Sequence, residues 1–134
     1  MYLNLLNDEQ KKCFLDYAIR LTTVDGHYSE TEQEMMFAYC DEMHIHFEER
    51  ANSFDIQSLV ETMKNICGER EKKIILFEAL GLALVDNKYH ENEVKLIEYT
   101  QQQFELDDTF VEKCKVYLDE YMKLQEKINT LVVG

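Results

Sequence analysis

The feature that most constrains the fold is the segment Ile74–Val85, IILFEALGLALV, in which ten of twelve residues are apolar. The exceptions are Glu78 and Gly81. A run without alternation fits either a buried strand or a helix that is apolar on every side. Together with the polar EREKK before it, the segment is too long for a typical strand, and its leucines and alanines favour a helix. It is also shorter than the roughly twenty residues that span a bilayer. We therefore predict a buried central helix at about 69–86, packed among other helices.

Composition indicates a single all-α domain that covers residues 1–134. The chain has no proline and four glycines, and 46% of its residues are hydrophobic while 31% are charged. This balance is typical of a folded protein, and 134 residues can bury a core without metal or disulfide staples. Because proline is common in loops and at sheet edges, its absence favours helices. We predict a compact bundle of six to seven helices.

The net charge of −13 restricts the partners that this chain can bind. An acidic surface repels phosphate backbones and anionic lipids, so nucleic-acid binding and membrane docking are disfavoured. It attracts cations and basic proteins, and we expect a protein partner. The start of the chain has no basic region followed by an apolar one, as a secretory signal would, and this predicts a cytoplasmic protein. Its four cysteines form no CxxC pair and are expected to be buried, reduced thiols: Cys13, Cys40, Cys67 and Cys114.

Capping signals predict where the helices begin and end. Asn7 followed by Gln10, and Ser29 followed by Glu32, are both capping boxes. The first helix is expected to stop at Asp25-Gly26, because glycine readily takes the left-handed conformation that ends helices. Three further helices are predicted. One begins at Asp55 and is closed by Gly68, and one lies at about 91–103. The last is capped by Asp107 or Asp108 and continues to about 129. Residues 44–54 are expected to form a loop with one helical turn.

The chain contains an internal repeat. The segment at 24–32, VDGHYSETE, matches the segment at 85–93, VDNKYHENE, in five of nine positions, at an offset of 61 residues. The register extends outward, since Leu15, Ala18 and Leu21 align with Leu76, Ala79 and Leu82. Two copies are too few for a solenoid. They predict two related helical hairpins in one bundle with approximate internal two-fold symmetry.

These repeated hairpins carry a resemblance to a known family. Through LLNDEQKKCFLDYAIRLTTVDGHYSETE and ILFEALGLALVDNKYHENEVKLIEYTQQQFELDD, the chain resembles the TerB-like domain of the tellurite-resistance proteins over about residues 5–115. The resemblance implies an all-helical bundle, a role in bacterial stress or tellurite resistance, no catalytic activity, and an acidic cluster proposed to bind a divalent metal. The second copy departs from the first at Asn87, which replaces Gly26, and at His90, which replaces Ser29. These changes weaken the expectation of two equal sites.

The repeated acidic residues are the candidate metal ligands: Asp25, Glu30, Glu32, Asp86, Glu91 and Glu93. Carboxylate oxygens suit Ca²⁺, Mg²⁺ or Mn²⁺, and four to six could converge if symmetry brings the hairpins together. The alternative is helix capping, since glutamate in a first turn completes a capping box and complements the helix dipole. Capping, with aspartate helping to form a turn near a helix end, is the preferred explanation, but it explains Asp25 and Asp86 less well because an acid at a helix C-terminus opposes the dipole. The segments lack the spacing and the glycine of an EF-hand.

Histidines and the central glutamate offer weaker alternatives. His27, His44, His46 and His90 could favour a softer metal, although solvated loop histidines are the simpler interpretation. Glu78 on an apolar helix lies either at a solvent-facing edge, which we prefer, or buried with a partner. No phosphate-binding loop, nucleophile elbow or Cys–His signature is present, so an enzyme centred on Glu78 is the least favoured hypothesis. A non-catalytic domain with a cation site or a docking surface on its acidic loops is the leading one, and an adaptor that never binds metal is its rival.

Overall fold

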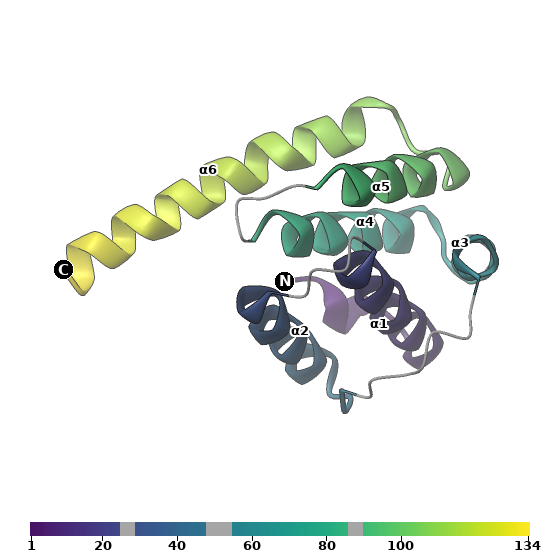
Figure 1. The fold of residues 1–134 in the computed structure, drawn as a ribbon, viewed down its shortest axis with the longest axis horizontal. Coiled ribbons are helices and arrows are strands. Elements are labelled where there is room, and N and C mark those ends of the chain that lie inside the picture. Colours follow the sequence, from purple (N-terminus) through teal and green to yellow (C-terminus); the bar gives the residue numbers. More distant parts are fainter. Residues whose placement is uncertain (25–28, 48–54, 86–89) are drawn as a thin grey trace.

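The computed structural model describes residues 1–24, 29–47, 55–85 and 90–134, which are helical with no strand (Figure 1). In these ranges, a short 3-10 helix precedes six α-helices. In chain order the elements are η1 (Leu3–Leu5), α1 (Asp8–Thr23), α2 (Glu30–Met43), α3 (Ile56–Ile66), α4 (Glu69–Leu84), α5 (Glu91–Gln103) and α6 (Thr109–Val132). The predicted all-α bundle is confirmed.

The central helix is confirmed in α4, which contacts η1, α1, α2, α5 and α6. Its buried side chains face several directions around the helix, since consecutive residues at 74–76 and again at 78–80 are buried. Leu82 and Ala83 extend this burial toward the C-terminal end. Because neighbours surround the helix, an apolar sequence on all sides is the stable solution.

Both predicted capping boxes are present. Asn7 Oδ1 accepts the backbone N–H of Gln10 at 2.9 Å, and Gln10 Oε1 accepts that of Asn7 at 2.9 Å. Ser29 Oγ accepts the N–H of Glu32 at 3.1 Å, and Glu32 Oε1 accepts that of Ser29 at 3.0 Å. Each box satisfies two backbone donors that would otherwise lack helical partners. Local chemistry therefore fixes the starts of α1 and α2.

The helix boundaries reproduce the internal repeat. Helices α1 and α4 begin 61 residues apart and end 61 residues apart, and the starts of α2 and α5 have the same offset. The buried positions correspond as well: Leu15, Ala18 and Leu21 are buried, as are Leu76, Ala79 and Leu82. The two hairpins thus share one helical design, and each buries matching faces in the common core.

The predicted helix ends were right at some positions and wrong at others. Gly68 does not close α3, because its φ is −80° and it occupies the N-cap position of α4, while α3 ends at Ile66. Asp55 occupies the predicted N-cap position of α3, but its side chain accepts no capping hydrogen bond. The predicted cap of α6 is present, because Asp107 Oδ1 accepts both the N–H and the hydroxyl of Thr109 at 2.8 Å. The last helix reaches Val132 rather than about 129.

Helix α6 extends beyond the body it packs on. Its buried residues, Val111, Cys114 and Leu118, all lie in its first half. Figure 1 shows the second half projecting beyond the other helices, with the C-terminus at its free end. The exposed apolar side chains of this half are therefore not part of the core.

Candidate functional site

The second glutamate of each repeated segment is an internal capping group. Glu32 is 5% exposed and Glu93 is 2% exposed. Glu32 Oε1 lies 3.0 Å from the backbone nitrogen of Ser29, and Glu93 Oε1 lies 3.3 Å from that of His90. Each carboxylate accepts the N-cap N–H of its own helix and sits at the positive end of the dipole. Glu32 and Glu93 therefore have the capping role that was predicted as the alternative to metal binding.

The other predicted ligands divide into exposed and undescribed residues. Glu30 and Glu91 are exposed, and Glu91 forms an ion pair with Lys95 at 3.1 Å. Asp25 and Asp86 lie outside the described residues. Within the described ranges, no three His, Cys, Asp or Glu side chains gather as a metal site requires. Glu30, Glu32, Glu91 and Glu93 therefore do not form such a site by themselves.

The histidines are dispersed. His44 ends α2 in the left-handed conformation, with φ 58°, and is exposed, as is His46. His90 occupies the N-cap position of α5, and His27 lies outside the described residues. The cysteines are free thiols, and burial raises the pKa of Cys67 to about 11, which disfavours the thiolate that binds metal. These groups support no soft-metal site in the described part of the chain.

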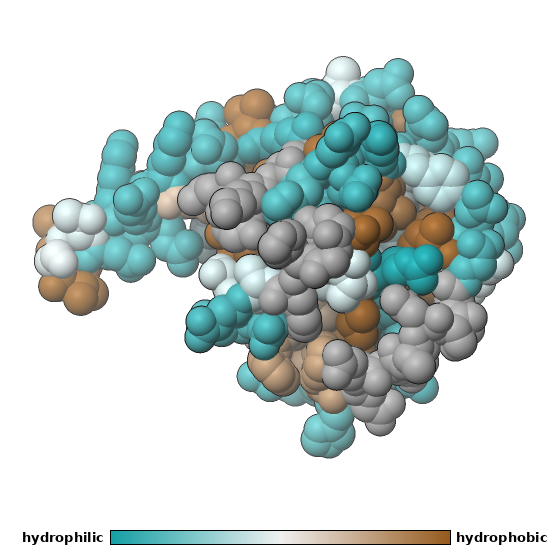
Figure 2. Space-filling model, viewed as in Figure 1, coloured by the Kyte–Doolittle hydropathy of each residue, from teal (hydrophilic) through white to brown (hydrophobic). Residues whose placement is uncertain are grey.

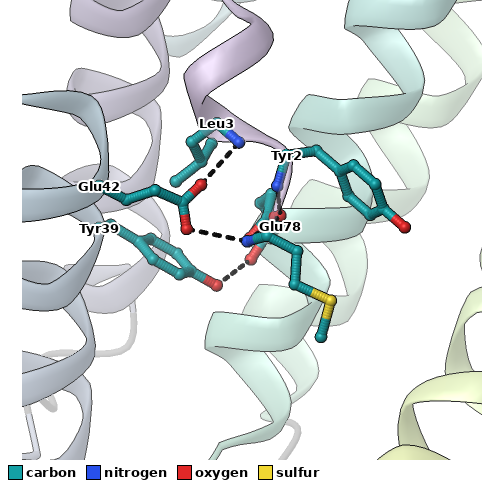
Figure 3. A network of polar contacts seen from close by, with 6 residues as sticks. Tyr2, Leu3, Tyr39, Glu42 and Glu78 are labelled. Atoms are coloured by element: carbon teal, nitrogen blue, oxygen red, sulfur yellow. Dashed lines mark hydrogen bonds and ion pairs between the residues drawn. The ribbon is translucent and has the colours of Figure 1, made fainter.

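Glu78 is buried, so its predicted place at a solvent-facing edge was wrong. Its side chain is 4% exposed. Its Oε1 accepts hydrogen bonds from the amine of Met1 and from the backbone N–H of Tyr2, each at 2.9 Å. Glu42 on α2 completes the arrangement (Figure 3). Its Oε1 accepts the Met1 amine at 2.9 Å, and its Oε2 accepts the N–H of Leu3 at 2.8 Å. Two carboxylates thus hold the start of the chain between α2 and α4.

The electrostatics of this network favour the charged amine. Burial alone lowers the pKa of the Met1 amine, but its hydrogen bonds to Glu78 and Glu42, together with their charges, raise this pKa above the ordinary 8.0 overall. Burial also raises the pKa of Tyr39 well above 10, and the charges of Glu78 and Glu42 add to this effect. The network therefore consists of a cation neutralised by two carboxylates beside a tyrosine that stays protonated.

Sequence reasoning missed this network for a clear reason. The lone acid in an apolar helix was the available signal, and a buried carboxylate needs a partner. The partner is the backbone amine of Met1 rather than a side chain, and no sequence pattern distinguishes Glu42 from a solvent-exposed glutamate. Helical periodicity gives no information about pairs so far apart along the chain, since Met1 and Glu78 are 77 positions apart.

A second feature is an apolar groove beside the N-terminal segment. It has a volume of about 590 Å³, and α4, α6 and the segment around η1 form its walls. We define this apolar groove by six of the residues that line it: Tyr2, Leu5, Phe77, Phe110, Cys114 and Tyr117. Residues 70 and 73, both basic, lie at its border, and each is in an ion pair, Arg70 with Glu71 and Lys73 with Glu69. The groove is the size of a ligand or side-chain docking site.

Comparison with known proteins identifies the fold. No family model matches the sequence, and no curated protein matches it. Among solved structures, the chain is similar to a tellurite resistance protein from Nostoc punctiforme PCC 73102, with a TM-score of 0.66 and 14% sequence identity. The alignment covers 96% of this chain and 84% of that one. The two proteins share a fold across nearly the whole chain. None of the helices in the described ranges is long and apolar enough to cross a membrane.

Proposed function

We propose that this chain is a non-catalytic, TerB-like binding domain of a tellurite-resistance or related stress system. It acts in the cytoplasm by docking a basic protein partner on its acidic surface. The fold shared with a tellurite resistance protein and the repeated VDGHYSETE and VDNKYHENE segments support the family. The net charge of −13 supports a basic partner.

The observation that carries the docking role is the contrast within each repeated segment. Glu32 and Glu93 are buried and cap their helices, so their carboxylates are occupied. Glu30 and Glu91, two positions earlier, are open to solvent at the same place in the two hairpins. An exposed carboxylate steers and orients a basic partner without being needed for folding.

The non-catalytic assignment is supported by the contacts of Glu78. Its buried Oε1 accepts two N–H groups of the N-terminal segment, and that segment covers it. These contacts support a structural task for this carboxylate. Its substitution Glu78→Gln should change stability, whereas an enzyme centred on this residue would lose turnover of its substrate.

The docking role can be tested with a partner recovered by cross-linking in cells and then purified. Glu30→Gln combined with Glu91→Gln should weaken its binding, and salt should weaken it further because the attraction is electrostatic. A chelator should have no effect. The matched control is Glu61→Gln with Glu126→Gln, which removes the same charge from exposed positions on α3 and α6. Equal weakening by both pairs would contradict a specific surface.

A divalent-cation site is the second candidate, and the duplication of the acidic pattern favours it. Asp25, Glu30 and Glu32 recur as Asp86, Glu91 and Glu93 in hairpins whose helix starts keep the same offset. Capping accounts for Glu32 and Glu93 but gives no reason for two aspartates. Carboxylate oxygens of this kind suit Ca²⁺, Mg²⁺ or Mn²⁺.

The test is thermal unfolding in chelator and in millimolar Ca²⁺, Mg²⁺, Mn²⁺ or Zn²⁺. An ion present at a hundred times its dissociation constant stabilises the folded state by about 2.7 kcal/mol, which is a shift of several degrees. Asp25→Asn combined with Asp86→Asn should abolish that shift. If no ion raises the unfolding temperature of the unmodified chain, this second candidate is rejected and the carboxylates remain caps and docking groups.

A further inference from the structure

The second half of α6 presents an apolar face that the body does not cover. Leu124 is 56% exposed, Ile128 51% and Leu131 85%. Figure 2 shows apolar residues gathered at the free end of this helix, beyond the polar surface of the body. Isolated apolar side chains on a surface are normal, but a continuous row along one helix indicates an interaction site.

This row continues a regular seam along the whole helix. Its residues alternate in spacings of four and three: Phe110, Cys114, Tyr117, Tyr121, Leu124, Ile128 and Leu131. A repeat that averages 3.5 residues keeps one face toward a partner helix, as in a coiled coil. We refer to these seven residues as the α6 seam. The near end of the α6 seam lines the apolar groove, because Phe110, Cys114, Tyr117 and Tyr121 border that cavity.

We propose that the α6 seam binds the same seam of a second copy, with the two helices antiparallel. The distal residues of each copy then enter the apolar groove of the other. The pairing is isologous, so it closes as a dimer with two-fold symmetry. This interaction surface uses none of the acidic residues of the repeated segments and does not depend on the docking role proposed above.

Charge complementarity selects a second copy in this orientation. Glu120 and Lys127 each precede a seam residue by one position and flank the seam on the same side. Within the described residues neither takes part in an ion pair, and the lysine nearest to Glu120 on this helix, Lys123, pairs with Asp119. In an antiparallel pair the positions that flank the seam on this side meet each other. Glu120 of one copy therefore lies beside Lys127 of the other, and symmetry produces this pair twice.

The pairing that brings Glu120 beside Lys127 also places distal seam residues at the apolar groove of the other copy. When Tyr121 packs against Leu124 of the second copy, Tyr117 meets Ile128 and Cys114 meets Leu131. The most exposed residue of the α6 seam, Leu131, thus reaches the wall of the groove. The overlap of residues 114–131 is about 27 Å long, which is short for a free coiled coil. Burial in a groove of about 590 Å³ adds the apolar contact that a short coiled coil lacks.

A parallel pair fits less well on two grounds. In that orientation Glu120 would face Gln125, and Lys127 would face Val132, so neither charge would find its opposite. It would also place two bodies of net charge −13 side by side, whereas the antiparallel pair keeps them at opposite ends.

Sedimentation equilibrium of the full chain tests the proposal. The expected result is a concentration-dependent rise from 16.0 kDa toward twice that mass. Leu124→Glu with Ile128→Glu should weaken association roughly a hundredfold or more, since each dimer loses four apolar contacts. Both residues are exposed in the single copy, so the unfolding temperature measured at dilution should not fall. The matched control is Val116→Glu, which is 54% exposed on the same helix but outside the α6 seam.

Charge reversal tests the orientation. Glu120→Lys alone, or Lys127→Glu alone, should weaken association about tenfold, because two attractive pairs become two repulsive ones. The double variant Glu120→Lys with Lys127→Glu should restore it. A single copy at every concentration would overturn the proposal, and so would binding of the seam to lipid vesicles without self-association. Dimers that both single reversals leave unchanged, or that the double variant fails to restore, would overturn the antiparallel pairing.

Discussion

Tyr39 donates its hydroxyl hydrogen to the backbone carbonyl of Glu78 at 2.8 Å, and this bond joins α2 of the first hairpin to α4 of the second. A second buried bond of 2.8 Å joins Tyr17 on α1 to Thr100 on α5. At the repeat offset of 61 residues, Tyr17 corresponds to Glu78 and Tyr39 to Thr100. The two bonds therefore join corresponding positions of the two hairpins. The halves share this contact position, while the chemistry of the contact differs between them.

Removing either tyrosine hydroxyl should cost stability. Thr100 Oγ1 donates to the carbonyl of Leu96 at 2.8 Å, so its bond with Tyr17 uses the tyrosine as donor. Tyr17→Phe and Tyr39→Phe should each lower the free energy of unfolding by about 1 kcal/mol. The bonds share no residue, so the double variant should equal the sum within about 0.5 kcal/mol. Urea unfolding measures these values, and the exposed Tyr117→Phe is the control. A neutral Tyr39→Phe would show that the cross-hairpin bond contributes nothing.

The contacts of the N-terminal amine with Glu78 and Glu42 predict that the stability of a chain beginning at Met1 depends on pH. Burial lowers the pKa of the amine, but the hydrogen bonds to Glu78 and Glu42, together with the charges of these carboxylates, raise it above 8.0 overall in the folded state. A group with a raised pKa stabilises the fold fully below its unfolded pKa and loses that contribution as pH rises through the folded value. Stability measured by urea unfolding should therefore fall as the pH rises above about 8.

Buried thiols contribute a loss of the same sign, because burial raises the pKa of Cys67 to about 11. Glu78→Gln separates the two effects. It removes a charge that holds the amine protonated, so the variant should be less stable at pH 7 and should lose less stability on going to pH 9. The exposed Glu61→Gln is the control and should keep the original slope. Parallel pH profiles for the original chain and Glu78→Gln would contradict the assignment of the slope to Met1.

The sequence predicted the parts of this fold that depend on local chemistry. Asn7 with Gln10 and Ser29 with Glu32 form capping boxes from residues three apart, and short-range patterns identify them directly. The central helix was predictable because apolar residues on all sides leave no surface position for it. Of the candidate site, the capping role of Glu32 and Glu93 was predictable in the same local terms. Asp25 and Asp86 lie outside the described residues.

Two features could not be predicted: contacts between residues far apart in the sequence, and the lack of a neighbouring helix over part of α6. The burial of Glu78 follows from an amine 77 positions away. The seven residues of the α6 seam have the spacing of a buried face throughout, yet the body covers only its first part. Periodicity shows which face is apolar, but it does not show whether this chain or another molecule covers it. The projecting half of α6 follows from the size of the body, which no local pattern encodes.

Capping energetics offer a comparison within one protein. Ser29→Ala should destabilise the fold by about 1 kcal/mol, because it leaves the N–H of Glu32 without its hydroxyl acceptor. Asp55→Ala should cost less than half of that, since Asp55 makes no side-chain cap on α3. Urea unfolding of both variants under the same conditions gives the difference. Equal costs would mean that the interaction of the side chain with the helix dipole, rather than the hydrogen bond, supports these helix starts.

Gly81 should be replaceable with a gain in stability. It lies inside α4, where glycine costs roughly 0.5–1 kcal/mol relative to alanine. A Cβ added there would lie 3.5 Å from the hydroxyl oxygen of Tyr39 and 3.9 Å from both Leu118 and Met35, which are ordinary contacts. Gly81→Ala should therefore raise the free energy of unfolding by up to about 1 kcal/mol.

A larger residue at position 81 separates helix propensity from available space. Gly81→Val would extend further toward the hydroxyl that donates to the carbonyl of Glu78, and a β-branched side chain has a lower helix propensity than alanine. Valine should therefore be less stable than alanine by more than their propensities alone predict. If valine instead matched alanine in urea unfolding, the packing between Tyr39 and α4 would be looser than the contacts indicate. If alanine were destabilising, Gly81 would be needed for the close approach of α2 and α6 to the central helix.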